Sequence, residues 1–523
     1  MQNNFSGISS KAWFFKIPGK FSGLSFKDKV FVAIIAFGLI ARVFALIVLP
    51  DAELNDTLYH LDITRYVAEN RALPPEILFG GPVTTPLYYF VTALPFIFFQ
   101  LPFTLSTARI FPFIFSAVQL FLAFALLKRI FPKNYLPGLA FVAVHPLLII
   151  FGALNYIETF ASIFVLLCFF VYWRFVETGK RVFLILMPFA IAACALSKAS
   201  ATILIPAFFF AFLFELIKKG KVHARKKMAI ALLFVFATLL LSSVWFLLAF
   251  FRTGDFLLTE TQAYHLTGES AITVLSADYV LTLPARFNAS FWFFLSQGFD
   301  TMPFGIRESD AFLLFSLVTG PLLIFIFFGL FQGVLKKEKQ HTLLLLCFIL
   351  LAVLLFAKGR KFIHSRLIIP ALPLFAIAFS AAFKELNSKK LGRLMLFLFC
   401  LTAIYGIAFS AFYAMHFRDE YENHVPLYQF VKALPADSVI AIHPNKIRQI
   451  GFIAERKAFA YKERFDDLNA AQLYSALRAE GITHIAATCY KNPWNMQAIE
   501  EMQAAGQAKL VYSDQCSNLF ELK

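Results

Sequence analysis

Long apolar segments alternate with short polar segments along most of the chain. The apolar segments have the length at which a helix crosses the hydrocarbon core of a bilayer. We predict eleven spans, at 30–49, 108–127, 136–152, 159–177, 182–197, 199–217, 228–250, 312–334, 342–357, 367–383 and 394–415. The first segment is too long for a signal-peptide core and lacks a small-residue cleavage site, so we predict a retained span. The pattern therefore indicates a mainly α, polytopic membrane protein.

Charge predicts how these spans are oriented. Basic residues concentrate in the N-terminal arm 1–29 and in loops at 128–133, 174–181, 218–227, 336–339 and 384–393. Basic loops collect on the cytoplasmic side of a membrane, so we place the arm in the cytoplasm and the C-terminal tail outside. Segment 86–100 is apolar but short, and counting it as a span would invert every later loop. We predict that it is a helix at the outer interface.

The pattern changes after Met415, where the spans end. Residues 416–523 have mixed polarity, with buried strands predicted at Ser438–Ile442 and His484–Ala487 and an amphipathic helix at Ala470–Glu480 between them. The β-α-β order indicates a small α/β domain outside the membrane. The predicted organisation is therefore an arm 1–29, a membrane domain 30–415 with a first outer loop 51–107, and an outer domain 416–523.

Composition excludes several classes of function. Only 15% of the 523 residues are charged, and the mean hydropathy is +0.70, whereas soluble proteins carry about 25% charged residues. The net charge of +16 lies mostly in the loops between spans, which indicates membrane topology and argues against nucleic acid. The sequence has no CxxC or HExxH pattern for zinc and no Gly-rich phosphate loop. Four cysteines lie in or beside spans; Cys489 and Cys516 would pair only in an oxidising compartment.

The first outer loop is unusually acidic, with six carboxylates between Asp51 and Pro86. Asn55–Asn70 has helical character, and Asp56 and His60 share a face because they are four residues apart. Asp56 has two readings: it caps the helix, or it is a general base. Asp62, Arg65 and Glu69 are spaced as a ladder of structural ion pairs.

Two further outer sites carry candidate chemistry. Glu158, just after Asn155, is bracketed by apolar spans and is either a functional carboxylate or an interfacial helix cap. The loop Lys358–Arg366 is basic although the topology places it outside, which indicates anion binding unless the loop is cytoplasmic. Lys198 and Arg109, at the outer ends of spans, either join this pocket or extend toward the interface.

The order of these motifs resembles the membrane-embedded C-type (GT-C) glycosyltransferases, with the protein O-mannosyltransferase and lipid A aminoarabinose transferase branch nearest. The resemblance covers about the first 415 residues. It rests on Asn55–His60, Arg65-Tyr66, Ala72–Pro74, Thr85–Tyr89, Thr107–Arg109, His145-Pro146, Asn155–Glu158, Leu196–Lys198, and Arg366 with Pro370 and Pro373.

This resemblance implies an enzyme that moves a sugar from a polyprenyl-phosphate carrier to a protein, lipid or glycan on the extracytoplasmic face, with inversion. It implies two catalytic carboxylates, Asp56 as the base and Glu158 as the second-loop acid. Donor-phosphate binding would fall to Arg360, Lys361, His364, Arg366 and Lys198, and substrate binding to Tyr59, His60, Asn155 and Arg109. Some branches hold a divalent cation (Mg or Mn), here on Asp56 and Glu158, and the metal stays open. Thr57 stands where the family usually has a second acidic residue.

Two other functions compete with this hypothesis. A lipid-linked-sugar transporter or flippase needs polar residues deep within spans, and few charges lie there. A scaffold that presents the outer domain leaves the acidic segment and the basic loop unexplained.

Overall fold

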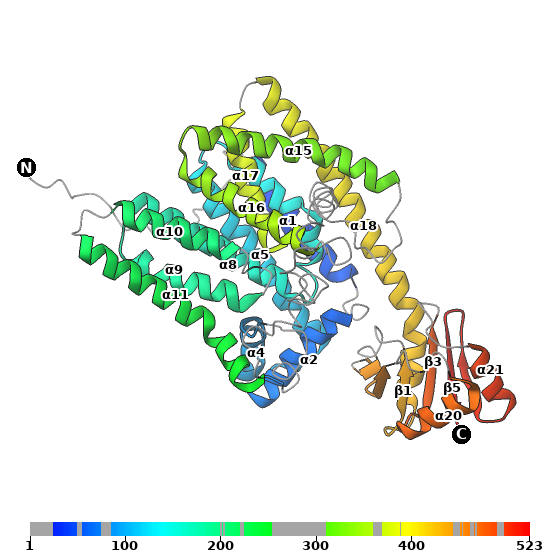
Figure 1. Ribbon diagram of the computed structural model, residues 1–523. Helices are drawn as coiled ribbons and strands as arrows, with labels where there is room; N and C mark the ends of the chain where they lie inside the picture. Colours follow the sequence, from blue (N-terminus) through cyan, green and yellow to red (C-terminus); the bar gives the residue numbers. More distant parts are fainter. Residues whose placement is uncertain are drawn as a thin grey trace, which may run out of the picture.

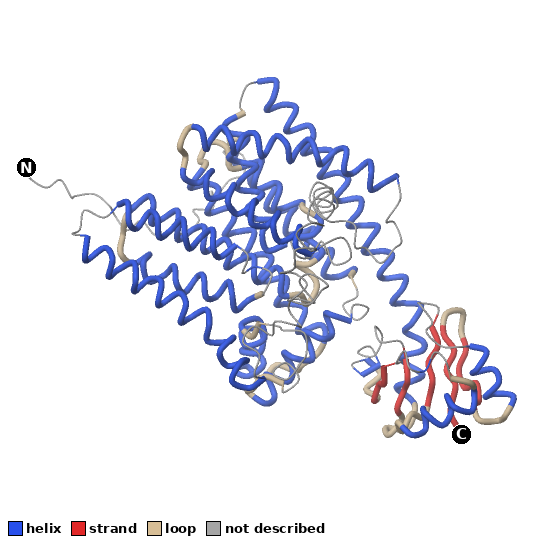
Figure 2. Tube along the Cα trace, in the orientation of Figure 1, coloured by secondary structure: helices blue, strands red, loops and turns tan. Residues whose placement is uncertain are grey.

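A bundle of helices and a small sheet domain make up the protein, joined by one long helix (Figures 1 and 2). The computed structural model describes residues 25–49, 55–74, 85–198, 201, 204–219, 224–253, 310–358, 369–386, 389–442, 450–451, 453–460, 465, 468–488 and 496–523.

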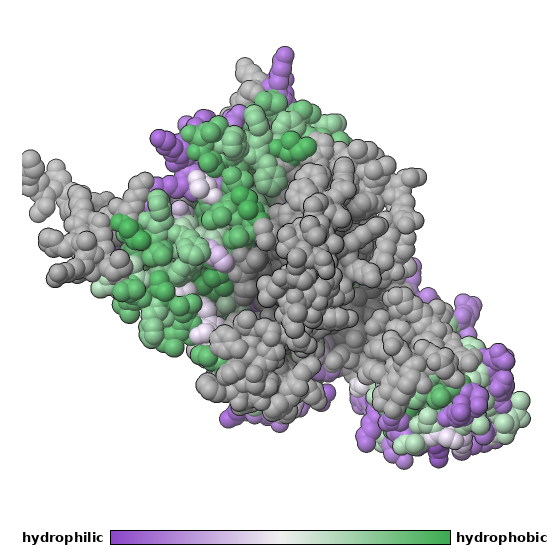
Figure 3. All heavy atoms as spheres, viewed as in Figure 1, coloured by the Kyte–Doolittle hydropathy of each residue, from purple (hydrophilic) through white to green (hydrophobic). Residues whose placement is uncertain are grey.

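Each predicted span coincides with helix in the bundle. The helices are α1 (Phe26–Val48), α5 (Leu105–Ile130), α6 (Leu136–Val144), α7 (Pro146–Ile150), α8 (Ile157–Thr178), α9 (Val182–Ser197), α10 (Ile205–Lys219), α11 (Ala224–Thr253), α15 (Asp310–Leu335), α16 (Lys339–Lys358), α17 (Leu372–Glu385) and α18 (Lys389–Ala433). Of the described helices, α1, α5 and α8 are long and apolar enough to cross a membrane alone. Large apolar side chains are exposed on the described helices of the bundle, and part of the face seen in Figure 3 is hydrophobic, as expected of lipid-facing helices. The total of eleven spans stays a prediction.

One predicted span, 136–152, is broken in the structure. α6 ends at Val144 and α7 begins at Pro146, with His145 between them in extended conformation. The break follows from the sequence, because proline has no N–H to donate and disfavours helical conformation in the residue before it. Carbonyl groups at the end of α6 therefore lose their helical partners inside a buried region.

Arg42 on α1 supplies the missing donors. Its side chain is fully buried, although it lies in the middle of an apolar helix. The guanidinium donates to the carbonyls of Val142 and Ala143 at 2.9 and 3.1 Å, to the carbonyl of Gly38 at 2.9 Å, and to Ser116 Oγ at 2.6 Å. One side chain thus joins α1, α5 and the end of α6.

Two short helices between α1 and α5 pack on each other beside the bundle. They are α2 (Asn55–Asn70) and α4 (Leu87–Phe99). With 13 residues, α4 is about 20 Å long, less than the roughly 30 Å of a hydrocarbon core. The helix predicted at 86–100 is therefore present, while its position at the interface stays a prediction.

The C-terminal domain is a five-stranded sheet in the order β2-β1-β3-β5-β4. Its elements are β1 (Val439–Ile442), β2 (Lys457–Ala460), α20 (Ala470–Ala479), β3 (His484–Thr488), α21 (Met496–Ala504), β4 (Ala508–Ser513) and β5 (Ser517–Leu522). β1 is parallel to β2 and β3, and β5 is antiparallel to β3 and β4. The end of α18 packs on this sheet through Leu427, Tyr428 and Val431.

Replacing Arg42 by methionine removes every donor to the α6 break while keeping much of the side-chain volume. We expect Arg42→Met to lower the free energy of unfolding by about 3 kcal/mol, because buried carbonyls left without donors cost about 1–3 kcal/mol each. Thermal unfolding in detergent micelles measures the change. Arg65→Met is the control, since Arg65 is exposed and its ion pair with Glu69 contributes at most about 1 kcal/mol. Equal unfolding midpoints for the two variants would contradict the role given to Arg42.

Candidate active site

Glu158 and Lys198 form an ion pair where α8 begins and α9 ends. Tyr156 precedes α8 in extended conformation, which places Glu158 in the first helical turn, and Lys198 is the residue that ends α9. A carboxylate is favoured at a helix N-terminus and an ammonium at a C-terminus, because each opposes the partial charge there. Both helix ends therefore favour the charges that meet between them.

The pair is buried and only partly satisfied. The side chain of Glu158 is 1% exposed and that of Lys198 is 12% exposed. Lys198 bonds to Oε1 of Glu158, and among the described residues Oε2 has no hydrogen-bond partner. An acceptor left open in a buried polar site is a place where a substrate hydroxyl or a water can donate.

A divalent cation does not fit the described part of this site. The described part of the site offers a cation one open oxygen, Oε2 of Glu158, and the Lys198 ammonium on Oε1 of the same carboxylate would repel it. We therefore use no metal in the reaction proposed below.

The turn that leads to Glu158 is tightly supported. A Cβ on Gly152 would lie 2.3 Å from Ser116 Oγ, so no larger residue fits there without a shift. Ser116 is the hydroxyl that accepts from Arg42, and Thr159 Oγ1 donates to the carbonyl of Phe151 at 3.0 Å. Asn155 in the same turn is buried, at 2% exposure. The position of Glu158 thus depends on contacts that reach back to α1.

His60 holds α2 against the start of α8. Its Nδ1 lies 2.7 Å from the hydroxyl of Tyr89 on α4, and its ring packs on Tyr156 with centroids 5.8 Å apart. Tyr88 packs on Phe160 of α8 at 5.6 Å. The structure therefore brings the first turns of α2 beside the turn that carries Glu158.

Asp56 is the second residue of α2, one turn before His60. The helix begins at Asn55, so Asp56 lies in its first turn, where a carboxylate is favoured. Its roles as cap and as base both stay predictions. Its side chain lies outside the described part of the structure, as do Arg360, Lys361, His364 and Arg366.

Two other predicted polar residues have structural contacts. Arg109, expected to bind substrate, donates to the carbonyl of Leu49 and so ties α5 to the end of α1. Arg65 pairs with Glu69 at 2.8 Å on the exposed face of α2, as the ladder predicted. Tyr59 lies on α2 next to His60, with ring centroids 5.7 Å apart.

One acidic residue of the C-terminal domain, Glu455, is affected by charge on α2. The ammonium of Lys432, 2.7 Å away, holds the pKa of Glu455 below its usual value, and Arg456 and Arg65 lower it further. Arg65 acts on Glu455 from α2, so the domain and this helix lie within electrostatic range.

Solved structures with the same architecture are known, although no protein-family model and no curated protein matches the sequence. ArnT from Cupriavidus metallidurans superposes with a TM-score of 0.61 at 12% identity, over 95% of this chain and 98% of ArnT. The same enzyme bound to undecaprenyl phosphate gives a TM-score of 0.60. The oligosaccharyltransferase AglB from Archaeoglobus fulgidus, in complex with an inhibitory peptide and a dolichol-phosphate, gives 0.54 at 12% identity, over 89% of this chain and 70% of AglB. AglB has also been solved with zinc and sulfate.

The chain has the GT-C fold.

Within the GT-C fold, sequence reasoning missed the residues that support the site. Arg42 was overlooked although an ionisable residue inside a span carries a role by default. Two residues of α5 were also missed. Ser116 accepts a hydrogen bond from Arg42, and Gln119 donates one to Ser162 on α8. Gly152 gave no sequence signal, because only the close approach of Ser116 shows why glycine is needed.

Lys198→Met tests whether the buried pair acts as a unit. The variant leaves the Glu158 carboxylate buried without its ammonium, and we expect a loss of roughly 3–5 kcal/mol in the free energy of unfolding. The double variant Glu158→Gln with Lys198→Met removes both charges and should recover most of that loss. Thermal unfolding in micelles compares the three proteins. A single variant as stable as the wild type, or a double variant no better than the single, would show that the pair does not form.

Proposed function

We propose that this protein is a membrane glycosyltransferase that moves a sugar from a polyprenyl-phosphate-linked donor to an acceptor hydroxyl or amine on the extracytoplasmic face. The proposal rests on one observation: the GT-C fold carries a buried carboxylate–ammonium pair where α2, α8 and α9 meet. The related ArnT structure holds undecaprenyl phosphate, and that of AglB holds dolichol-phosphate. A polyprenyl-phosphate donor and a protein, lipid or glycan acceptor are therefore the partners we propose.

Asp56 is the proposed base. It takes the proton of the acceptor as the acceptor oxygen or nitrogen forms a bond to the anomeric carbon. The bond from that carbon to the phosphate oxygen breaks on the opposite side, so the configuration inverts and polyprenyl phosphate leaves. His60, one turn further along α2, positions this turn through Tyr89 and Tyr156.

The leaving phosphate gains negative charge, and cations stabilise it. We assign this role to Lys198 and to the loop that contains Arg360, Lys361, His364 and Arg366. Glu158 holds the ammonium of Lys198 in place, while its open Oε2 accepts a hydrogen bond from the sugar or the acceptor. Asn155 and Tyr59 complete the proposed substrate contacts.

The reaction site faces away from the cytoplasm in this proposal. Support comes from the basic loops and from Cys516, which is in a disulfide, whereas Cys168, Cys194, Cys347 and Cys400 are not. Disulfides persist in oxidising compartments outside the cytoplasm. The outer domain on α18 would then stand on the same side as α2.

Asp56→Asn is the direct test of the base. We expect transfer from a lipid-linked donor to fall about 100-fold or more, because a positioned general base contributes about 10²–10⁴ in rate, while the unfolding midpoint stays unchanged. Asp62→Asn, the same chemical change on the same helix, serves as the control and should retain activity. Full activity in Asp56→Asn would remove Asp56 from the mechanism. Movement of donor lipid across vesicles with no glycosylated product would favour a flippase.

The orientation can be tested by labelling single cysteines from outside intact cells. Asp437→Cys in the outer domain should react with a membrane-impermeant maleimide, and Lys337→Cys in the turn between α15 and α16 should not; both positions are exposed. The reverse pattern would place the site in the cytoplasm.

A further inference from the structure

A second polar cluster lies at the opposite end of the bundle from Glu158. Its members are Glu338, His341 and Glu385. α10 begins a few residues after Lys198 and runs for 15 residues, about 22 Å. Near its far end, Glu215 forms an ion pair with Lys339 at 2.5 Å. Lys339 is the first residue of α16 and follows Glu338 directly. The proposed glycosyl transfer therefore uses none of these groups.

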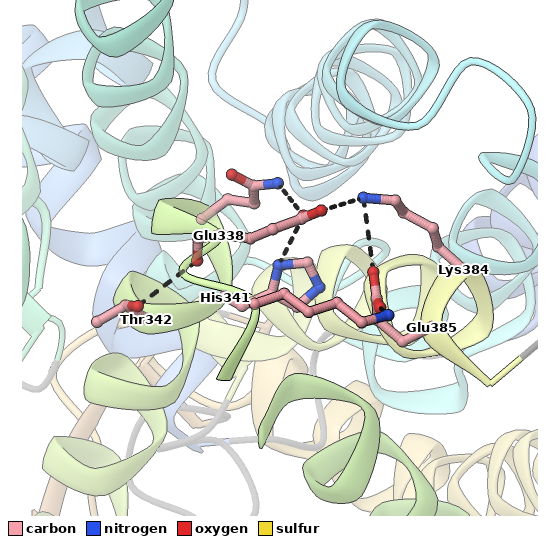
Figure 4. A network of polar contacts seen from close by, with 7 residues as sticks. Glu338, His341, Thr342, Lys384 and Glu385 are labelled. Carbon is pink, nitrogen blue, oxygen red and sulfur yellow. Dashed lines mark hydrogen bonds and ion pairs between the residues drawn. The ribbon is translucent and has the colours of Figure 1, made fainter. Parts of the chain in front are cut away.

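The imidazole of His341 is buried between the two carboxylates (Figure 4). Its side chain is 0% exposed, and neither ring nitrogen makes a hydrogen bond of normal geometry with a described residue, although the carbonyl of Ala381 faces the ring. A buried imidazole with unsatisfied nitrogens is costly. Each ring nitrogen of His341 is therefore available to bind a cation, beside the carboxylates of Glu338 and Glu385.

The backbone is built to admit this imidazole. A Cβ on Gly333 would lie 2.2 Å from Cδ2 of His341, so only glycine on α15 leaves room for the ring. Lys337 takes a positive φ of 60° in the turn after α15. This turn places Glu338 directly before α16 and three residues before His341. A Cβ on Gly329 would lie 2.5 Å from Cα of Ala382, so α15 and α17 pack closely at this point. This close packing positions the end of α17, which carries Glu385.

The spacing of the donor atoms suits a tetrahedral cation. His341 Nδ1 and Glu338 Oε2 are 3.2 Å apart, close to the edge of about 3.3–3.6 Å in a zinc tetrahedron with bonds of about 2.0–2.2 Å. One ligand atom from each of the three residues lies within 4.8 Å of the others. An imidazole among carboxylates favours a transition cation such as zinc over magnesium or calcium.

Two lysines now neutralise the carboxylates. Lys384 lies 2.5 Å from Glu338 and 3.5 Å from Glu385, and Lys336 pairs with Glu385. Both are surface side chains, 38% and 61% exposed, so they can move into water. Replacing two ammonium groups by one divalent cation leaves the net charge of the cluster unchanged.

We propose that Glu338, His341 and Glu385 bind a zinc-class divalent cation that joins the turn after α15, the first turn of α16 and the end of α17, with water as the fourth ligand. Lys336 and Lys384 neutralise the carboxylates when no cation is bound, and the cation replaces them when it binds.

The test uses the full chain in detergent micelles, stripped of metal and then given zinc chloride alone. We expect one zinc per chain by mass spectrometry of the bound metal, a rise in the unfolding midpoint, and a zinc-edge absorption spectrum with one imidazole nitrogen and carboxylate oxygens. No bound zinc above the metal-stripped background would overturn the site.

Variants separate this site from adventitious binding. His341→Ala and Glu385→Gln should each weaken zinc binding by about 100-fold or more, since even residues behind the ligands change metal affinity by about 10–100-fold. Lys384→Gln should strengthen it by about threefold, because a competing ion pair is lost. Glu215→Gln, at the same end of the bundle, should leave it unchanged. Zinc binding that is equal in Glu385→Gln and wild type, or weaker in Lys384→Gln, would overturn the proposal.

Discussion

A broken helix inside an apolar bundle must find donors for its carbonyls, and the rest of this structure depends on how that need is met. Pro146 follows the end of α6, and the guanidinium of Arg42 on α1 donates to the buried carbonyls of Val142 and Ala143. No water is present in a hydrocarbon core to take this role. The same guanidinium holds Ser116, against which Gly152 packs. The turn that carries Glu158 is therefore fixed by a residue on a different helix.

The site itself is assembled from helix ends. Glu158 begins α8, Lys198 ends α9, and Asp56 lies in the first turn of α2. Helix ends present partial charges and unpaired backbone groups, and three of them converge here. Such a junction favours opposite charges side by side in a buried region, as in the pair of Glu158 with Lys198. The polar chemistry is therefore confined to a small region of an otherwise apolar bundle.

Sequence patterns predicted the helices and the strands β1 and β3 well, because apolar runs and buried strands have strong periodic signals. They failed where partners are distant in the sequence. The span 136–152 was predicted as unbroken, and the donor that satisfies the carbonyls at the break comes about 100 residues earlier, at Arg42. The strands β2, β4 and β5 were missed; in β4 only one position is buried and the pattern does not alternate cleanly. The pairing of Glu158 with Lys198 likewise required the packing of α8 on α9, which no local pattern encodes.

α18 runs without interruption for 45 residues, about 68 Å, from contacts with α15 and α6 in the bundle to the core beneath the sheet. α18 therefore joins the bundle to the C-terminal domain without a described loop between them. Pro426 lies inside the helix, and a proline favours a bend because it cannot donate to the preceding turn. A change of direction at this one residue would reorient the whole sheet relative to the bundle.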